Sequence, residues 1–103
     1  MQRKVKFFNE KVMKREDKAS VETRLLDIQS ELGELAKEVL KATDYGKKSF
    51  VKTDDFEMEF GDVFYSLLSL ADEAELDAEE CLNKALAKYQ ERMNKKNNIG
   101  SGR

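Results

Sequence analysis

Apolar residues recur at helical spacing along most of the chain. Leu25, Ile28, Leu32, Leu35 and Val39 follow one another at intervals of three and four residues, which places them on one face of a helix. Three other segments repeat this period: Val5, Phe8 and Val12; Phe56, Phe60, Val63, Phe64, Leu67, Leu70, Ala71 and Ala74; and Leu82, Ala85, Leu86, Tyr89 and Met93. The pattern predicts four amphipathic helices, of which the second should be largely buried.

Short polar residues mark the starts of three of these helices. Ser20, Thr53 and Asp77 each precede an apolar helical segment, where a side-chain oxygen can accept a hydrogen bond from a first-turn backbone N–H. Glu80, three residues after Asp77, completes the pattern of a capping box in which Asp replaces Ser or Thr. We therefore expect helices to begin directly after these three residues.

The ends of the helices carry weaker signals. The first helix is expected at about residues 2–16, and Gly46 should stop the second, because glycine adopts the left-handed conformation of a helix end without strain. A basic loop at 47–52 follows. The fourth helix is expected to fray near Asn97 and to leave residues 99–103 as a flexible tail.

Length and composition favour one small all-α domain. The chain has 103 residues, no proline, five glycines, 39% charged residues and 40% hydrophobic residues. The absence of proline suits long helices, and a split chain would leave pieces too small to bury a core. We expect a single domain at residues 1–98 with a four-helix, bundle-like fold.

Charge, cysteine content and hydropathy narrow the functional classes. Nineteen basic and 21 acidic residues give a net charge of −2, which does not favour binding to a nucleic acid polymer. Cys81 is the only cysteine, so an intramolecular disulfide is excluded and a reducing, cytoplasmic setting fits best. No apolar run approaches the ~20 residues of a membrane span, and no signal peptide is recognisable.

Two pairs of acids carry the clearest chemical signal. Glu31 and Glu34 are three residues apart in the second predicted helix, as are Glu59 and Asp62 in the third. Residues at this spacing share one helix face, so two adjacent helices could direct four carboxylates to one point. The chain has no histidine, the commonest transition-metal ligand, so the pattern indicates an oxygen-ligated ion, magnesium or manganese.

An ordinary solvated helix surface is the alternative for these acids, since glutamates on amphipathic helices are usually exposed. Each pair, however, encloses a glycine, Gly33 or Gly61. A glycine inside a helix costs about 1 kcal/mol relative to alanine. The two glycines suggest close contact between helices at the level of the acids.

The residues Glu31-Leu32-Gly33-Glu34 and Glu59-Phe60-Gly61-Asp62 with their flanking sequence resemble the all-α nucleotide pyrophosphohydrolases of the MazG type. The likeness covers about residues 20–93 and rests on a Glu-x-x-Glu in one helix and a Glu-x-x-Asp in the next. It departs from the family at Ser30, where relatives commonly have a further glutamate.

The resemblance implies that Glu31, Glu34, Glu59 and Asp62 ligate magnesium. It also implies hydrolysis of a nucleoside triphosphate between the α and β phosphates, giving the monophosphate and pyrophosphate. Glu38, one turn after Glu34, is a candidate base or support for the ligands, with a solvated glutamate as the alternative.

The fourth predicted helix offers a phosphate-binding surface. Lys84, Lys88 and Arg92 stand four residues apart and form a basic strip beside the apolar face, and the resemblance supports a phosphate role for the last two. Pairing of these cations with neighbouring glutamates is the alternative. No set of residues that reads the base can be assigned; five aromatic residues could stack on it, namely Phe7, Phe8, Tyr45, Phe50 and Tyr65.

The wide apolar arcs of the predicted helices favour a homodimer or homotetramer, and the resemblance implies the same. Two other functions stay open. The chain could be a non-catalytic helical dimerisation protein with surface acids, or a nucleotide-binding regulator that keeps the fold and hydrolyses poorly.

Overall fold

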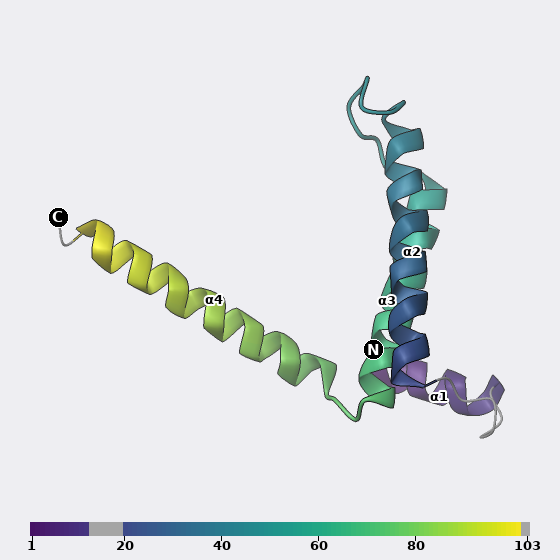
Figure 1. Cartoon of the computed structure of the whole chain (residues 1–103), viewed down its shortest axis with the longest axis horizontal. Coiled ribbons are helices and arrows are strands. Elements are labelled where there is room, and N and C mark those ends of the chain that lie inside the picture. Colours follow the sequence, from purple (N-terminus) through teal and green to yellow (C-terminus); the bar gives the residue numbers. More distant parts are fainter. Residues whose placement is uncertain (13–19, 102–103) are drawn as a thin grey trace.

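The computed structural model describes the backbone of residues 1–12 and 20–101 and the side chains up to residue 97. This part of the chain contains helices and no strands (Figure 1), so the all-α prediction is confirmed. The helices are α1 (Gln2–Val12), α2 (Val21–Ala42), α3 (Asp54–Glu73) and α4 (Ala78–Ser101). The predicted end of the first helix, at 13–16, lies outside the described residues.

All three predicted caps are confirmed. The side chains of Ser20, Thr53 and Asp77 each accept a hydrogen bond from the backbone N–H three residues later, at donor–acceptor distances of 3.2, 3.0 and 3.1 Å. Each bond satisfies one of the N–H groups that a helix leaves free in its first turn.

The stop of α2 lies earlier than predicted. The helix ends at Ala42, not at Gly46, because Asp44 adopts the left-handed conformation with φ +49°. The N–H of Tyr45 then donates to the carbonyl of Leu40 at 2.7 Å, which closes the last turn. Aspartate tolerates this conformation better than most residues, so the turn needs glycine only later, at Gly46 itself with φ +86°.

The ends of α3 and α4 also need comment. α3 ends in the same way as α2, with Glu75 at φ +58° and a bond of 2.8 Å from the N–H of Leu76 to the carbonyl of Ala71. α4 continues to Ser101, beyond the position near Asn97 where the sequence predicts fraying. The flexibility of a tail from residue 99 stays a prediction.

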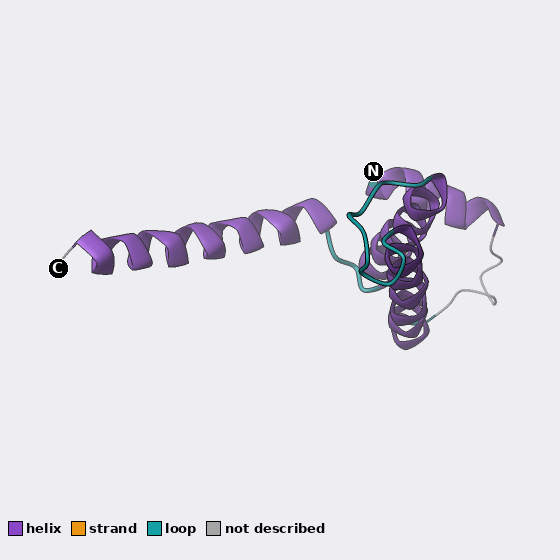
Figure 2. Ribbon diagram, turned by 90° about the horizontal axis from the view of Figure 1, so that it is seen from above, coloured by secondary structure: helices purple, strands orange, loops and turns teal. Residues whose placement is uncertain are grey.

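α2 and α3 form an antiparallel hairpin whose loop lies at one end, and α1 packs across α3 at the other end (Figures 1 and 2). The buried side chains lie mainly in this hairpin: Arg24, Ile28, Ser66, Leu68, Ser69 and Ala71. The expectation that α2 is largely buried is wrong, since Leu25 is 51% and Leu32 48% exposed. Helical periodicity predicts which side chains share an apolar face, but it does not predict whether another part of the protein covers that face.

The side chain of Gln2 joins α1 to the start of α4. Its Nε2 donates to the carbonyl of Leu76, and its Oε1 accepts from the N–H of Ala78, both at 2.7 Å. The second bond satisfies a free N–H at the first residue of α4. A residue at the start of the chain therefore holds the junction between α3 and α4.

α4 projects away from the other three helices (Figures 1 and 2) and does not close a bundle within one chain. Of the five residues predicted to form its inner face, Ala85 is partly buried and the other four are exposed: Leu82 by 56%, Leu86 by 54%, Tyr89 by 53% and Met93 by 57%. Among the described residues, no helix has both the length and the apolar character that crossing a membrane requires.

Candidate metal site

Three of the four predicted ligand residues converge between α2 and α3. Glu31, from α2, and Glu59 and Asp62, from α3, each place a carboxylate oxygen within 4.8 Å of the others. Glu31 and Glu59 are partly buried, and Asp62 is exposed. The antiparallel packing of two straight helices brings together residues 28 positions apart, and the three-residue spacing aligns the two acids of α3.

The carboxylates influence one another electrostatically. The pKa of Glu59 is raised above its ordinary value, first because partial burial penalises the charged form. Repulsion by Asp62, Glu31, Glu34 and Glu38 raises this pKa further, in that order of importance. Glu34 is thus close enough to repel Glu59, although its oxygens are not among the three that converge. A cation bound among these groups would instead favour the charged form of Glu59.

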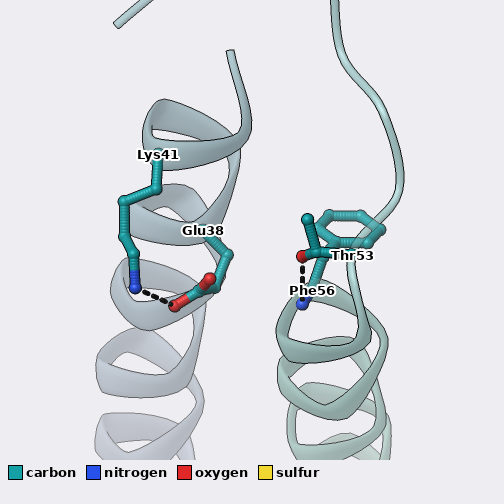
Figure 3. A network of polar contacts seen from close by, with 4 residues as sticks. All are labelled: Glu38, Lys41, Thr53 and Phe56. Carbon is teal, nitrogen blue, oxygen red and sulfur yellow. Dashed lines mark hydrogen bonds and ion pairs between the residues drawn. The ribbon is translucent and has the colours of Figure 1, made fainter. Parts of the chain in front are cut away.

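Glu38 lies further along α2, toward the loop, and is held by a lysine. The Nζ of Lys41 donates to the Oε1 of Glu38 at 3.2 Å (Figure 3), and the Glu38 side chain is only 15% exposed. The hydrogen bond and the charge of Glu38 raise the pKa of Lys41 above its ordinary value. Sequence reasoning missed Lys41, although the spacing of three residues from Glu38 could have indicated the pair.

A comparison with known protein families supplies the deciding observation. The model of the MazG nucleotide pyrophosphohydrolase domain matches residues 19–96, most of the chain. The chain belongs to the MazG family. Searches of curated proteins and of solved structures gave no significant match. Membership confirms the family resemblance and the all-α MazG-type fold, and the matched region includes all the acids described above.

The donors of this MazG site suit a divalent cation that prefers oxygen. Mg²⁺ binds carboxylate oxygens at about 2.0–2.1 Å in octahedral geometry, so oxygens on opposite sides of the ion lie about 4 Å apart. The oxygens of Glu31, Glu59 and Asp62 lie within 4.8 Å of one another, and side-chain rotation would have to bring them closer, because three ligands of one octahedral ion include neighbouring positions only about 3 Å apart. Exposed Asp62 has the freedom to make such an adjustment.

The basic strip of α4 is not near this site. Lys84, Lys88 and Arg92 are exposed on the helix that leads away from the hairpin (Figure 1). Lys88 lies over the ring of Tyr89, with Nζ 5.0 Å from the ring centroid. Within a single chain, the structure therefore separates the predicted phosphate-binding residues from the predicted metal ligands.

The two glycines beside the acids do not mark a close helix contact within the chain. A Cβ added at Gly33 or Gly61 would meet no atom within 4 Å in the described structure. The expected close contact between helices at these glycines is therefore absent within one chain, because both positions face open space. Space for another molecule remains at the level of the acids.

The candidate base-stacking residues fall into two groups. Tyr45 and Phe50 lie in the α2–α3 loop, where the ring of Phe50 packs edge-on against Phe56 with centroids 4.9 Å apart. The second group lies where α1 meets α3, and its Phe8 and Tyr65 rings are in contact. Sequence reasoning did not separate the groups, because α1 and α3 are more than 40 residues apart.

Proposed function

We propose that this MazG protein is a magnesium-dependent nucleoside triphosphate pyrophosphohydrolase. It would take a (d)NTP and water to the (d)NMP and pyrophosphate, with removal of unwanted nucleotides from the cellular pool as its role. The convergence of Glu31, Glu59 and Asp62 within 4.8 Å, inside the region that matches the family, carries this proposal.

In this proposal Glu31, Glu34, Glu59 and Asp62 hold Mg²⁺, with Mn²⁺ as a substitute. The bound ion would screen the phosphate charges and favour ionisation of water. Partial burial and repulsion by the neighbouring acids disfavour the charged form of Glu59 without a cation, which favours binding of the ion.

Glu38 is the proposed base for the attacking water. Its limited exposure of 15% keeps bulk water away, and the bond from Lys41 holds its carboxylate in place. Glu38 would accept the proton of the water as its oxygen attacks phosphorus, and pyrophosphate would leave. Lys41 thus acts on Glu38 and not on the substrate.

The phosphate-binding role of Lys84, Lys88 and Arg92 requires a second copy of the chain. The proposed homodimer or homotetramer would cover the exposed apolar side chains of α4 and place its basic strip near the acids of a neighbour. The strip's positive charge complements the acidic site, and the open space at Gly33 and Gly61 leaves room for such a neighbour.

Release of pyrophosphate from a panel of nucleoside triphosphates in the presence of Mg²⁺ tests the proposed activity. We expect Glu34→Gln and Asp62→Asn each to lower the turnover at least about 1,000-fold, because loss of a ligand charge removes several kcal/mol of transition-state stabilisation. Glu57→Gln, an exposed acid of α3 paired with Lys52, is the matched control and should stay active. Near-normal turnover in both ligand variants would refute the metal assignment.

The same panel distinguishes the other two functions. A helical dimerisation protein would release no pyrophosphate and would bind no metal at the acids. A regulator on this fold would bind nucleotide with Mg²⁺ and release it unchanged. The partial burial of Glu31, Glu38 and Glu59 supports the enzyme, because acids that serve only solubility are normally fully exposed.

A further inference from the structure

One amide and two aromatic rings meet where α1 crosses α3. The Nδ2 of Asn9 donates to the Oγ of Ser69 at 3.0 Å, and the hydroxyl of Tyr65 donates to the Oδ1 of Asn9. The Phe8 ring lies edge-on to the Tyr65 ring, with centroids 6.1 Å apart and an interplanar angle of 84°. Ser69 is almost completely buried, whereas Phe8 is 53% exposed.

These bonds fix the orientation of the Asn9 amide and leave half of its capacity for hydrogen bonds. An amide has two N–H donors and an oxygen that can accept two bonds. Ser69 occupies one N–H, and Tyr65 occupies one acceptor position. No other described residue bonds to the remaining N–H and acceptor position, and asparagine uses such groups to form hydrogen bonds to the edge of a nucleobase.

The amide lies on the strip of α3 that also carries a proposed metal ligand. Tyr65 and Ser69 follow Asp62 by three and seven residues, so the three share one side of the helix. At the rise of an α-helix, they stand roughly 5 and 10 Å from Asp62 along the axis. One nucleotide could therefore extend from the carboxylates to Asn9.

We propose that Phe8, Asn9 and Tyr65 form the surface that binds the nucleobase of the substrate. The base stacks on the exposed Phe8 ring, and Asn9 forms hydrogen bonds to the base edge. Tyr65 and Ser69 hold the amide in position. This inference rests on the proposed function, because it locates the base relative to the triphosphate at the acids.

The competing explanation is that the cluster only packs α1 against α3. Kinetics with a deoxyribose triphosphate that lacks a base separates the two explanations, because this probe retains the phosphates and cannot use the amide. In Phe8→Leu and Asn9→Leu, we expect the KM for nucleoside triphosphates to rise about tenfold with little change in kcat, in line with the loss of stacking or of a base contact. The KM for the base-free probe should not change.

Two further variants keep the test sharp. Asn9→Asp retains the acceptor for the Tyr65 hydroxyl and loses the N–H donors, so it should flatten the preference among bases even if Asn9→Leu folds poorly. Phe7→Leu is the matched control: Phe7 is 62% exposed and neighbours Phe8 on α1 but lies about 100° around the helix. Its KM values should match those of the unaltered chain.

The outcomes distinguish failure of this inference from failure of the proposed function. If the unaltered chain hydrolyses no triphosphate, the proposed function and the proposed base-binding surface are both rejected. If the unaltered chain is active, equal increases of KM for nucleotides and for the base-free probe reject the base surface alone. Indistinguishable effects of Phe7→Leu and Phe8→Leu reject it as well.

Discussion

The α2–α3 hairpin and α4 contrast in what completes them. The hairpin buries side chains between its two helices and gathers Glu31, Glu59 and Asp62 without help from another molecule. α4 has a regular apolar face, no helix of the described part of the chain packs against it, and the helix that carries the basic strip projects away from the hairpin (Figure 2). The proposed metal site is thus formed by one chain, whereas the proposed phosphate site requires two.

Mixing two inactive variants is the strongest test of this contrast. One chain carries Asp62→Asn, and the other carries Lys88→Ala with Arg92→Ala. If α4 serves a neighbour's acids, random exchange into dimers restores about a quarter of the normal activity, because half of the dimers are mixed and each has one intact site. Pyrophosphate release after co-refolding measures it.

No restoration in the mixture, with each variant inactive alone, would mean that both residue sets act within one chain. α4 would then have to fold back onto its own hairpin. A mixture of Asp62→Asn with Glu34→Gln serves as the control and should stay inactive, because both changes affect the same set of ligands.

The next largest effect concerns the apolar face of α4. Leu82→Lys combined with Leu86→Lys should convert the proposed oligomer to a monomer, because each half-exposed leucine contributes about 1 kcal/mol or more when an interface buries it. Light scattering coupled to size-exclusion chromatography measures the mass. As the control, Asn83→Lys adds a charge to α4 away from the apolar face and should leave the mass unchanged. If the unaltered chain is already a monomer, the proposed assembly is contradicted.

Removal of one acid should change the response of the hairpin to magnesium and to pH. At saturating Mg²⁺, at 100 times Kd, the unaltered chain should gain about 2.7 kcal/mol of stability, or roughly 10–20 °C in Tm. Glu59→Gln should lose most of this gain, because the metal loses a charged ligand. Thermal unfolding followed by circular dichroism measures both proteins.

The pH dependence of the same two proteins has a defined sign. The folded-state pKa of Glu59 is raised above the ordinary value of 4.5, so the folded chain holds this proton more tightly than the unfolded chain. Its contribution to stability is therefore lost as the pH rises from about 4.5 through the folded-state pKa. Without metal, Glu59→Gln should match the unaltered chain at pH 4 and exceed it at pH 8; a lower Tm at pH 8 would contradict the mutual repulsion.

The smallest predicted effect probes the open space beside the acids. Gly33→Ala should stabilise an isolated chain by about 1 kcal/mol, because a new Cβ meets no atom within 4 Å and alanine favours a helix. If a second copy packs against this surface, the same change should weaken the assembly instead. The free energy of unfolding in urea, measured with and without Gly33→Ala, compares the two cases: the Leu82→Lys, Leu86→Lys variant represents the isolated chain, and the otherwise unaltered chain represents the assembly.

The sequence predicted features that depend on neighbours in the chain. Ser20, Thr53 and Asp77 were identified because a cap involves only the next three residues, and the acids of each helix because they are three positions apart. Gly46 was a wrong stop because Asp44 also tolerates the left-handed conformation, and composition alone does not rank the two.

Features that depend on tertiary arrangement were not predictable in this way. The Asn9–Tyr65 bond joins residues 56 positions apart, and no local pattern marks either partner. The exposure of Leu82 and Leu86 has a similar cause, since an amphipathic helix has the same sequence whether its own chain or another one covers it.

The two hydrogen bonds of Gln2 lie at the start of α4, so a small movement of this side chain displaces the far end of the helix by much more. α4 has 24 residues and is therefore roughly 36 Å long, so a rotation of 10° at Ala78 would move its far end by about 6 Å. A single amide in α1 thus helps to set the direction of a helix whose far end lies well away from it. A change that displaces the Gln2 side chain would alter where the carboxyl-terminal end of α4 can reach.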